Sequence, residues 1–317
     1  MSERTGLSDM ELAVLFAADG AGDGQYRRSV DVLADLHAAT GLGPAHAYPL
    51  LVDLAVPWKL LDPLIDTNGN FGTPGNDPPA HPRYTECRPS RLGQLALAVE
   101  RGDVAPLPIG LAIGTLHAGG SRPPLPAPAV ADALSALIAS DGAVADEWLS
   151  DCFWPLVLPG GCEVLGDREA FESGARTTLR LRAGITREPT RRQPTSSTLV
   201  ITALPYDVNP DDLMLRLAQT SRHRHVPDEF PELAALLAGS VVDVRDESSA
   251  RAGMRIVVEA LGEVEAEHML RSIWGVERDL EVEFPAGPAL AIRRFWAAAR
   301  GADLTAAVAR LRVAGAG

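Results

Sequence analysis

The chain has 317 residues, of which 46% are hydrophobic, and a formal net charge of −13. This length allows two domains with buried cores, and the acidic balance excludes a protein whose whole surface binds nucleic acid, although a local basic groove is allowed. No apolar run reaches the roughly 18 to 20 residues of a membrane helix, and the start of the chain lacks a secretory pattern, so we expect a cytoplasmic protein without membrane contact. The three cysteines match neither a disulfide framework nor a zinc pattern.

Helical patterns dominate the first part of the chain. Ser8 is placed to cap a helix over residues 7–22, and further helices are expected over 26–41 and 46–56. Helices joined by short glycine turns are typical of helix-turn-helix modules.

Turn-forming residues then interrupt the helical pattern. Residues 66–79 are rich in Gly, Asn, Asp and Pro, which predicts a loop without a packed element. Residues 81–101 become helical through 92–99. A proline-rich stretch over 119–128 predicts a linker, and we place a domain boundary near residue 120.

The second half alternates between strand and helix patterns. Residues 177–182 and 198–204 are predicted to form a strand pair around a polar turn at 186–197. Further strands are expected over 240–244, 254–259 and 280–284, and helices over 210–219, 230–238, 263–274 and 288–313. This order of elements predicts an α+β fold.

Three longer motifs carry a family resemblance. Residues 66–88 contain Asn-Gly-Asn-Phe-Gly and, further on, Arg-Tyr-Thr-Glu. Residues 201–209 contain Leu-Pro-Tyr-Asp-Val-Asn, and residues 246–259 read Asp-Glu-Ser-Ser, then Gly-Met-Arg-Ile-Val-Val-Glu. In the same order, these resemble three segments of the A subunit of bacterial DNA gyrase and topoisomerase IV, which are type IIA topoisomerases. The resemblance covers roughly residues 40 to 290.

The resemblance implies a domain plan. A winged-helix domain of the helix-turn-helix type would span residues 1–120 and carry the tyrosine loop, and an α/β tower domain would span 121–288. Residues 289–317 would form the start of a coiled-coil helix. We expect the exit gate and the DNA-wrapping domain of that family to be missing, so the chain resembles a truncated A subunit.

The resemblance also implies a site and its partners. Tyr84 matches the tyrosine that attacks a DNA phosphodiester, and Arg83 matches the neighbouring arginine, which could stabilise charge on the phosphate. Magnesium would come from the Toprim domain of a B-type subunit, so no metal or cofactor is expected on this chain itself. The implied partners are double-stranded DNA, a second copy of the chain and that B-type subunit, which together would work at the nucleoid.

A group of basic and apolar residues is predicted to contact DNA. Between residues 174 and 192 six arginines accompany a single acid, Glu188, and this ribbon could meet phosphates or could be a solvated edge hairpin protected by its charge. Leu111 resembles an apolar wedge between base steps, with core packing as the alternative. The predicted DNA-contacting residues are Arg88, Arg91, Leu111, Arg176, Arg180, Arg182, Arg191 and Arg192.

Two departures from the family bear on activity. The family's His-Pro-His-Gly segment aligns with Thr-Gly-Leu-Gly at residues 40–43, and the arginine pair of an early helix is absent from residues 12–16. Losing both charge-stabilising groups would cost several orders of magnitude in rate, unless His46, Arg27 or Arg28 substitutes.

Three functions therefore stay open. The chain could be an A-type subunit that cleaves and religates DNA with a B-type partner. It could be a catalytically degenerate homologue that binds DNA or a gyrase subunit, which it modulates or protects. It could also be a dimeric scaffold that no longer binds DNA.

Overall fold

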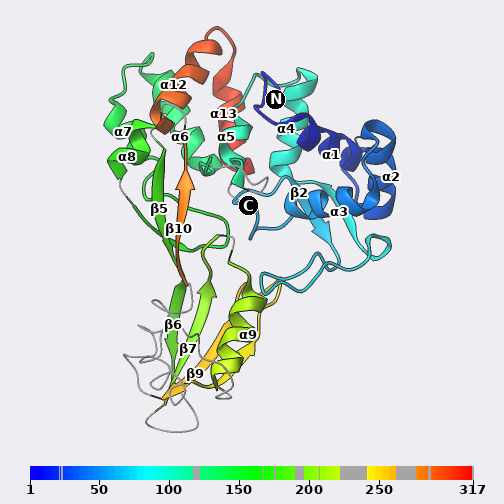
Figure 1. The fold of residues 1–317 in the computed structure, drawn as a ribbon. Coiled ribbons are helices and arrows are strands. Elements are labelled where there is room, and N and C mark those ends of the chain that lie inside the picture. The colour runs from blue at the N-terminus through cyan, green and yellow to red at the C-terminus, as the bar shows by residue number, and fades with distance from the viewer. Residues whose placement is uncertain are drawn as a thin grey trace.

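The computed structural model shows two lobes, a larger helical one and a smaller one built on a sheet (Figure 1). The structure describes residues 1–20, 22, 24–116, 122–166, 168–174, 176–189, 196–206, 208–221, 241–261, 276–284 and 287–315. Helices and antiparallel sheets both contribute, which confirms the predicted α+β class.

Three helices open the larger lobe: α1 (Asp9–Asp19), α2 (Ser29–Thr40) and α3 (Pro44–Asp53). The predicted cap of α1 is present, because the Ser8 hydroxyl accepts from the Glu11 amide at 3.2 Å and the Glu11 carboxylate accepts from the Ser8 amide at 2.7 Å. The second helix begins three residues later than predicted, at Ser29, because the two preceding residues are drawn into a sheet.

That sheet has the strand order β1-β3-β2 and is antiparallel throughout. Its strands are β1 (Arg27–Arg28), β2 (Ile65–Asn68) and β3 (Glu86–Pro89). The prediction that residues 66–79 hold no packed element is therefore wrong for 66–68. These residues are locally turn-like, but they follow the buried Ile65 and pair with residues 86–88 of β3.

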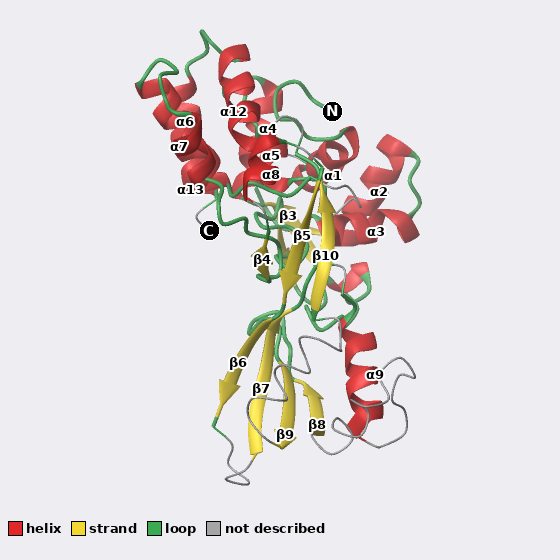
Figure 2. Ribbon diagram, turned by 60° about the vertical axis from the view of Figure 1, so that its left-hand side comes forward, coloured by secondary structure: helices red, strands yellow, loops and turns green. Residues whose placement is uncertain are grey.

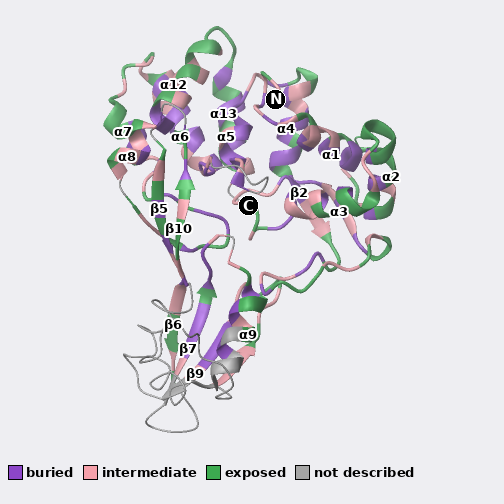
Figure 3. Ribbon diagram, in the orientation of Figure 1, coloured by how far each residue is buried: buried purple, intermediate pink, exposed green. Residues whose placement is uncertain are grey.

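Among the described residues, the helices that follow in the larger lobe are α4 (Arg91–Arg101), α5 (Ile109–Ile113), α6 (Ala127–Ala139), α7 (Asp146–Asp151) and α8 (Arg168–Ser173). Ser90 caps α4 by accepting from the Gly93 amide at 3.1 Å. Leu134 and Leu137 of α6 belong to the same buried cluster as Leu7 and Leu95. The core is thus continuous across residue 120, where the sequence suggested a boundary (Figure 3).

Two sheets lie end to end below the helices (Figure 2). The upper sheet has the order β10-β5-β4, with β4 (Glu163–Leu165), β5 (Thr177–Arg182) and β10 (Glu277–Val282). The lower sheet has the order β6-β7-β9-β8, with β6 (Gly184–Glu188), β7 (Ser196–Ala203), β8 (Val241–Asp246) and β9 (Ile256–Leu261).

The predicted pairing of residues 177–182 with 198–204 is wrong. β5 pairs with β4 and β10 in the upper sheet, whereas β7 pairs with β6 and β9 in the lower one. The segment predicted as a polar turn begins with β6, whose Thr186, Arg187 and Glu188 form ladder pairs with β7. Its polar composition suits a strand at the edge of a sheet.

Helix α9 (Pro210–Ser221) packs on the lower sheet and closes a second, smaller core. Leu213 and Leu217, one helical turn apart, meet Leu199, Ile201 and Val258 of the strands. The predicted helices over 230–238 and 263–274 lie outside the described residues.

The C-terminal region contains two helices, α12 (Gly287–Ala298) and α13 (Leu304–Ala314). The prediction of one helix that starts a coiled coil is wrong here, because the chain turns at Gly301, whose φ is +100°. Leu304, Val308 and Leu311 of α13 are buried in the main core, and both helices pack against α6. Within the part of the chain that the structure describes, no helix has the length and apolarity to cross a bilayer.

Candidate active site

Tyr84 lies on a short 3-10 turn, η1 (Pro82–Tyr84), between the loop that follows β2 and the start of β3. The Tyr84 amide closes the turn by donating to the His81 carbonyl at 2.8 Å. The Tyr84 side chain is 72% exposed, which is unusual for a large aromatic residue.

The segment around this turn is anchored from below. Thr85 is fully buried, and its hydroxyl donates to the Ser29 hydroxyl at 2.8 Å while its carbonyl accepts from the Ser29 amide at 2.8 Å. The Tyr48 hydroxyl donates to the Ala80 carbonyl at 2.7 Å, and burial raises the pKa of Tyr48, so this hydroxyl keeps its proton. The segment that carries the exposed Tyr84 side chain is therefore held in place by hydrogen bonds to α2 and α3.

Cys87 is the nearest alternative nucleophile along β3. It is fully buried, and burial raises its pKa to about 11. Its thiol stays protonated and hidden, so Tyr84 is the accessible nucleophile of this segment.

Arg83 stands beside Tyr84, as the motif predicts. Its guanidinium carbon lies 6.0 Å from the centre of the Tyr84 ring, and its Nε donates to Nδ1 of His81 at 3.3 Å. Among the described residues no carboxylate forms an ion pair with Arg83, so its positive charge is available to an incoming anion.

Other arginines of this region are already paired. Arg28 binds both carboxylate oxygens of Asp31, at 2.9 and 3.1 Å, and Arg27 binds Asp35 at 2.7 Å and the Ala17 carbonyl. Both guanidinium groups are therefore already bound within the protein.

The two further arginines predicted to contact DNA near the turn differ from each other. Arg88 donates to Asp66 at 3.4 Å and to the Gly24 carbonyl at 3.2 Å, and its guanidinium lies 4.4 Å from the centre of the Tyr26 ring. Arg91 is exposed in the first turn of α4 and has no ion-pair partner in the described part of the chain. Their contact with DNA stays a prediction.

His46 and Leu111 are not brought into the turn by any described contact. His46 is exposed on α3. Leu111, on α5, is partly buried against the main core and lines a cavity of about 220 Å³ with the first residues of the chain and Phe295. Core packing thus accounts for part of the Leu111 side chain, and its role as a wedge stays a prediction.

The arginines of β5 and its N-terminal flank face acids on β10. Arg176 pairs with Glu281 at 3.0 Å, Arg180 with Asp279 at 3.1 Å and Arg182 with Glu277 at 2.6 Å. The sheet sets an acidic strand beside this basic ribbon, which offsets part of its positive charge. The contact of Arg176, Arg180 and Arg182 with DNA stays a prediction. Arg191 and Arg192 lie outside the described residues.

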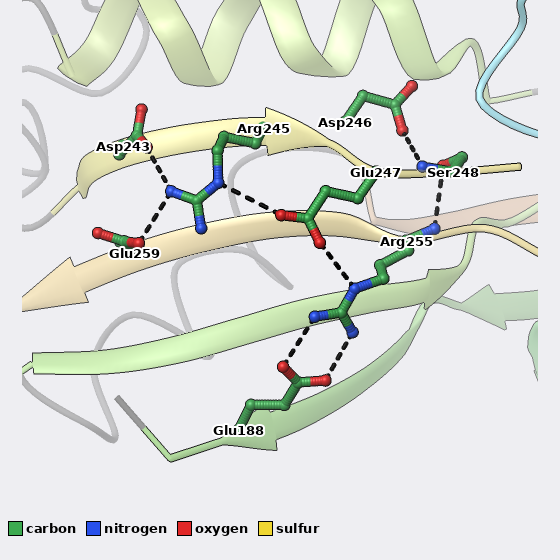
Figure 4. A network of polar contacts seen from close by, with 8 residues as sticks. All are labelled: Glu188, Asp243, Arg245, Asp246, Glu247, Ser248, Arg255 and Glu259. Atoms are coloured by element: carbon green, nitrogen blue, oxygen red, sulfur yellow. Dashed lines mark hydrogen bonds and ion pairs between the residues drawn. The ribbon is translucent and has the colours of Figure 1, made fainter. Parts of the chain in front are cut away.

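A network of ion pairs in the smaller lobe was not anticipated from the sequence (Figure 4). Arg255 binds both oxygens of Glu188, at 2.6 and 2.8 Å, and also Glu247 at 2.9 Å. Arg245 joins Glu247, Asp243 and Glu259. The hydrogen bonds from Arg255 lower the pKa of Glu188 and of Glu247. Arg245 and Arg255 thus form ion pairs with acids of the same sheet and the turn that follows β8.

The loop before Tyr84 also touches the smaller lobe. Asn76 Nδ2 donates to Asp211 Oδ2 of α9 at 2.6 Å. Gly75 lies so close to the turn after β8 that an added Cβ would be 2.3 Å from Asp246 Oδ2 and 2.9 Å from Ser248 Cβ. One chain segment therefore contacts the smaller lobe at its tip and leads into the tyrosine turn.

Tyr84 lines neither the cavity beside Leu111 nor a second, larger one. The larger cavity, of about 670 Å³, lies where the loop meets both lobes and is lined in part by Trp58, Pro74 and Tyr206. An exposed tyrosine outside a pocket suits a macromolecule better than an enclosed small molecule. Among the described residues no group of three or more His, Cys, Asp or Glu could hold a metal ion.

His81 is the member of this site that the sequence did not single out. Its Nδ1 accepts from the Arg83 amide at 3.3 Å, and its ring lies 6.4 Å from the Tyr84 ring, centre to centre, at an angle of 68°. The sequence signal was present, since a histidine before proline three residues ahead of the tyrosine can cap a short turn.

The comparison with known proteins gives one consistent result. No family model matches the chain. The A subunit of DNA gyrase from Streptomyces coelicolor is 30% identical over 89% of this chain and 35% of the relative. Its counterpart from Mycobacterium tuberculosis is 30% identical over 86% of the chain and 34% of the relative, and that from Treponema pallidum is 30% identical over 81% and 33%. The chain spans about a third of the length of these relatives. It is therefore a DNA gyrase A-like protein.

Proposed function

We propose that this chain binds double-stranded DNA and presents Tyr84 to a backbone phosphate, in a complex with a B-type subunit. The observation that carries the proposal is the exposed phenol on an anchored turn, beside an arginine without an ion-pair partner in the described chain. Because no described carboxylate pairs with Arg83, its guanidinium can bind an anionic substrate without first breaking a salt bridge.

The proposed reaction is a reversible phosphoryl transfer. The Tyr84 oxygen forms a bond to phosphorus as the bond from phosphorus to one sugar oxygen breaks. The phenol proton passes, on balance, to the departing sugar oxygen. Religation is the reverse of these steps, and it needs no oxidant or energy source. Arg83 would offset the charge that builds up on the phosphate oxygens.

Magnesium would be held by the partner. In the proposed complex the Toprim domain of the B-type subunit supplies Mg²⁺, which stabilises charge on the phosphate. This chain would contribute the nucleophile, the neighbouring arginine and the shape of the DNA-binding face. A second copy of the chain would provide a second tyrosine for the opposite DNA strand.

We also assign the family's domains to the two lobes. Helices α1 to α3 followed by the antiparallel sheet β1-β3-β2 support a winged-helix domain around Tyr84. The sheet β6-β7-β9-β8 with α9 supports a tower domain in the smaller lobe. In this assignment the tyrosine loop is the link between the two domains.

A plasmid cleavage assay tests the proposal. The chain is mixed with supercoiled plasmid, Mg²⁺ and a B-type subunit from the same cell, and covalent complexes are trapped with detergent. Linear or nicked DNA attached to protein is expected with the native chain and absent with Tyr84→Phe. If the native chain gives no adduct under conditions in which it binds both DNA and the B-type subunit, the cleavage proposal fails.

A second candidate is a catalytically silent homologue that binds DNA or a gyrase subunit. The ion pairs of Arg27, Arg28 and Arg88 favour it, because they leave little uncommitted charge around the turn. DNA or subunit binding that is unchanged by Tyr84→Phe, without any adduct, would support this candidate.

A further inference from the structure

His81 is held in one orientation next to the tyrosine. It caps the turn that carries Tyr84, its side chain is exposed, and its ring stands edge-on to the Tyr84 ring with 6.4 Å between centres. Arg83 lies on the same turn and contacts both residues. The Arg83 guanidinium and the His81 ring thus both lie within 6.4 Å of the centre of the Tyr84 ring.

The contacts of His81 determine which ring nitrogen carries its hydrogen. A backbone amide can only donate, so Nδ1 must offer its lone pair to the Arg83 amide, and it receives Arg83 Nε as well, both at 3.3 Å. In the neutral ring the hydrogen is then on Nε2. No described residue accepts a hydrogen bond from Nε2, so this N–H is an unused donor.

We propose that His81 donates this Nε2–H to a non-bridging oxygen of the phosphate that Tyr84 attacks. The inference rests on the proposed function and adds a catalytic residue to it. Arg83 supplies charge and His81 supplies a neutral, directed donor. A donor fixed before the reaction stabilises the extra charge on the phosphate without reorganising.

The same geometry argues against His81 as the base that removes the Tyr84 proton. A base needs a free lone pair, and the Nδ1 lone pair is already shared with the Arg83 amide. The donor role and the base role differ in what can replace the histidine, because an amide side chain can donate a hydrogen bond but cannot accept a proton at neutral pH.

Two substitutions separate the donor from the cap. In His81→Asn the side-chain oxygen can still accept from the Arg83 amide, so the turn keeps its cap but loses the Nε2 donor. In His81→Gln the longer amide reaches roughly the position of Nε2 and restores a donor. His37→Ala is the matched control, since His37 is an exposed histidine of α2 outside the turn.

The experiment measures the single-turnover rate of covalent adduct formation with Mg²⁺ and the B-type subunit. His81→Asn is expected to slow the reaction about 10²- to 10³-fold, as loss of a donor to a transition-state oxyanion does. His81→Gln is expected to recover most of the rate, and His37→Ala to leave it unchanged. A native rate in His81→Asn would overturn the inference, because the cap alone would then explain the histidine.

A chemically modified DNA distinguishes the donor role of His81 from a purely structural role, because only the donor role depends on a particular phosphate oxygen. A methylphosphonate at the cleavage position replaces one non-bridging oxygen by a methyl group, which removes the proposed acceptor in one of its two stereoisomers. The penalty of His81→Asn is expected to vanish for that isomer and to persist for the other. An equal penalty on both isomers would overturn the inference and leave the proposed function intact. No adduct from the native chain would overturn both.

Discussion

Arginines in two regions of this protein have opposite surroundings. On the tyrosine turn a single arginine, Arg83, has no ion-pair partner among the described residues and lies beside an exposed phenol. On β5 and its flank several arginines looked like a DNA-binding ribbon, yet Arg176, Arg180 and Arg182 each face an acid across the sheet. The number of positive charges along a segment is thus a poor guide to the electrostatic potential at its surface. Acids on the neighbouring strand determine how much of that positive charge is left unpaired.

Arg83→Ala offers the sharpest test of this contrast. If the unpaired arginine stabilises the charged phosphate, its loss is expected to lower the rate of Tyr84-dependent cleavage about 10²- to 10³-fold. Arg180→Ala is the matched control and should leave the rate nearly unchanged, since Arg180 is held by Asp279. Equal losses in both variants would show that the two regions do not differ in function.

Gly75→Ala tests whether the loop before the tyrosine turn is mechanically tied to the smaller lobe. The added methyl group would lie 2.3 Å from Asp246 Oδ2 and 2.9 Å from Ser248 Cβ. The Asp246 carboxylate can turn away, but the contact with Ser248 Cβ requires the loop or the turn after β8 to shift. Overpacking of this kind typically costs about 1–3 kcal/mol of stability. Hydrogen exchange followed by mass spectrometry should show faster exchange in residues 69–85 and in 246–255 together.

The control for this variant is Gly253→Ala, because nothing lies within 4 Å of a Cβ added there, although its φ of +77° adds local strain. That strain should affect residues 246–255 and leave 69–85 at the native exchange rate. Faster exchange confined to one of the two segments in Gly75→Ala would mean that the contact does not couple them.

Removing the acids of β10 tests the neutralised arginines directly. The triple variant Glu277→Gln, Asp279→Asn, Glu281→Gln removes these three ion pairs without adding side-chain bulk, and Arg182 keeps only its longer contact with Glu163, at 3.7 Å. DNA affinity is then expected to rise about tenfold at low salt, and the salt dependence should steepen by up to about 0.9 in log–log slope for each new phosphate contact. Unchanged affinity and slope would place this strand away from DNA.

The smallest effect is expected from the ion-pair network of the smaller lobe. Arg255 holds the pKa of Glu188 and of Glu247 below the ordinary value of 4.5. A carboxyl whose pKa is lowered in the folded protein stabilises it fully above its unfolded pKa, and this contribution is lost as the pH falls through the lowered value. Because these groups are exposed, the effect should be small.

Thermal unfolding of the native chain and of Arg255→Gln between about pH 3 and pH 7 would measure that contribution. The native chain should melt at a higher temperature near neutral pH, and the difference should shrink toward the acid end. A difference that is independent of pH would mean that Arg255 acts through packing alone.

Local sequence determined much of the fold. The Ser8 and Glu11 pair begins α1 as predicted, the periodic leucines of residues 92–99 lie within α4, and the alternating pattern of 177–182 forms β5. These signals depend on neighbouring residues, so a single chain reveals them. The Arg-Tyr-Thr-Glu motif likewise located Tyr84 and Arg83, because a nucleophile and its flanking arginine are adjacent in sequence.

Only the tertiary structure decided which strands are neighbours and which charges cancel. Residues 66–68 become a strand because β3 lies alongside them, and Arg180 loses its free charge because Asp279, 99 residues later, is its cross-strand partner. His81 becomes part of the site through the geometry of one turn. Pairing and burial depend on contacts between distant segments, and those contacts determine which of the predicted arginines keep an available charge.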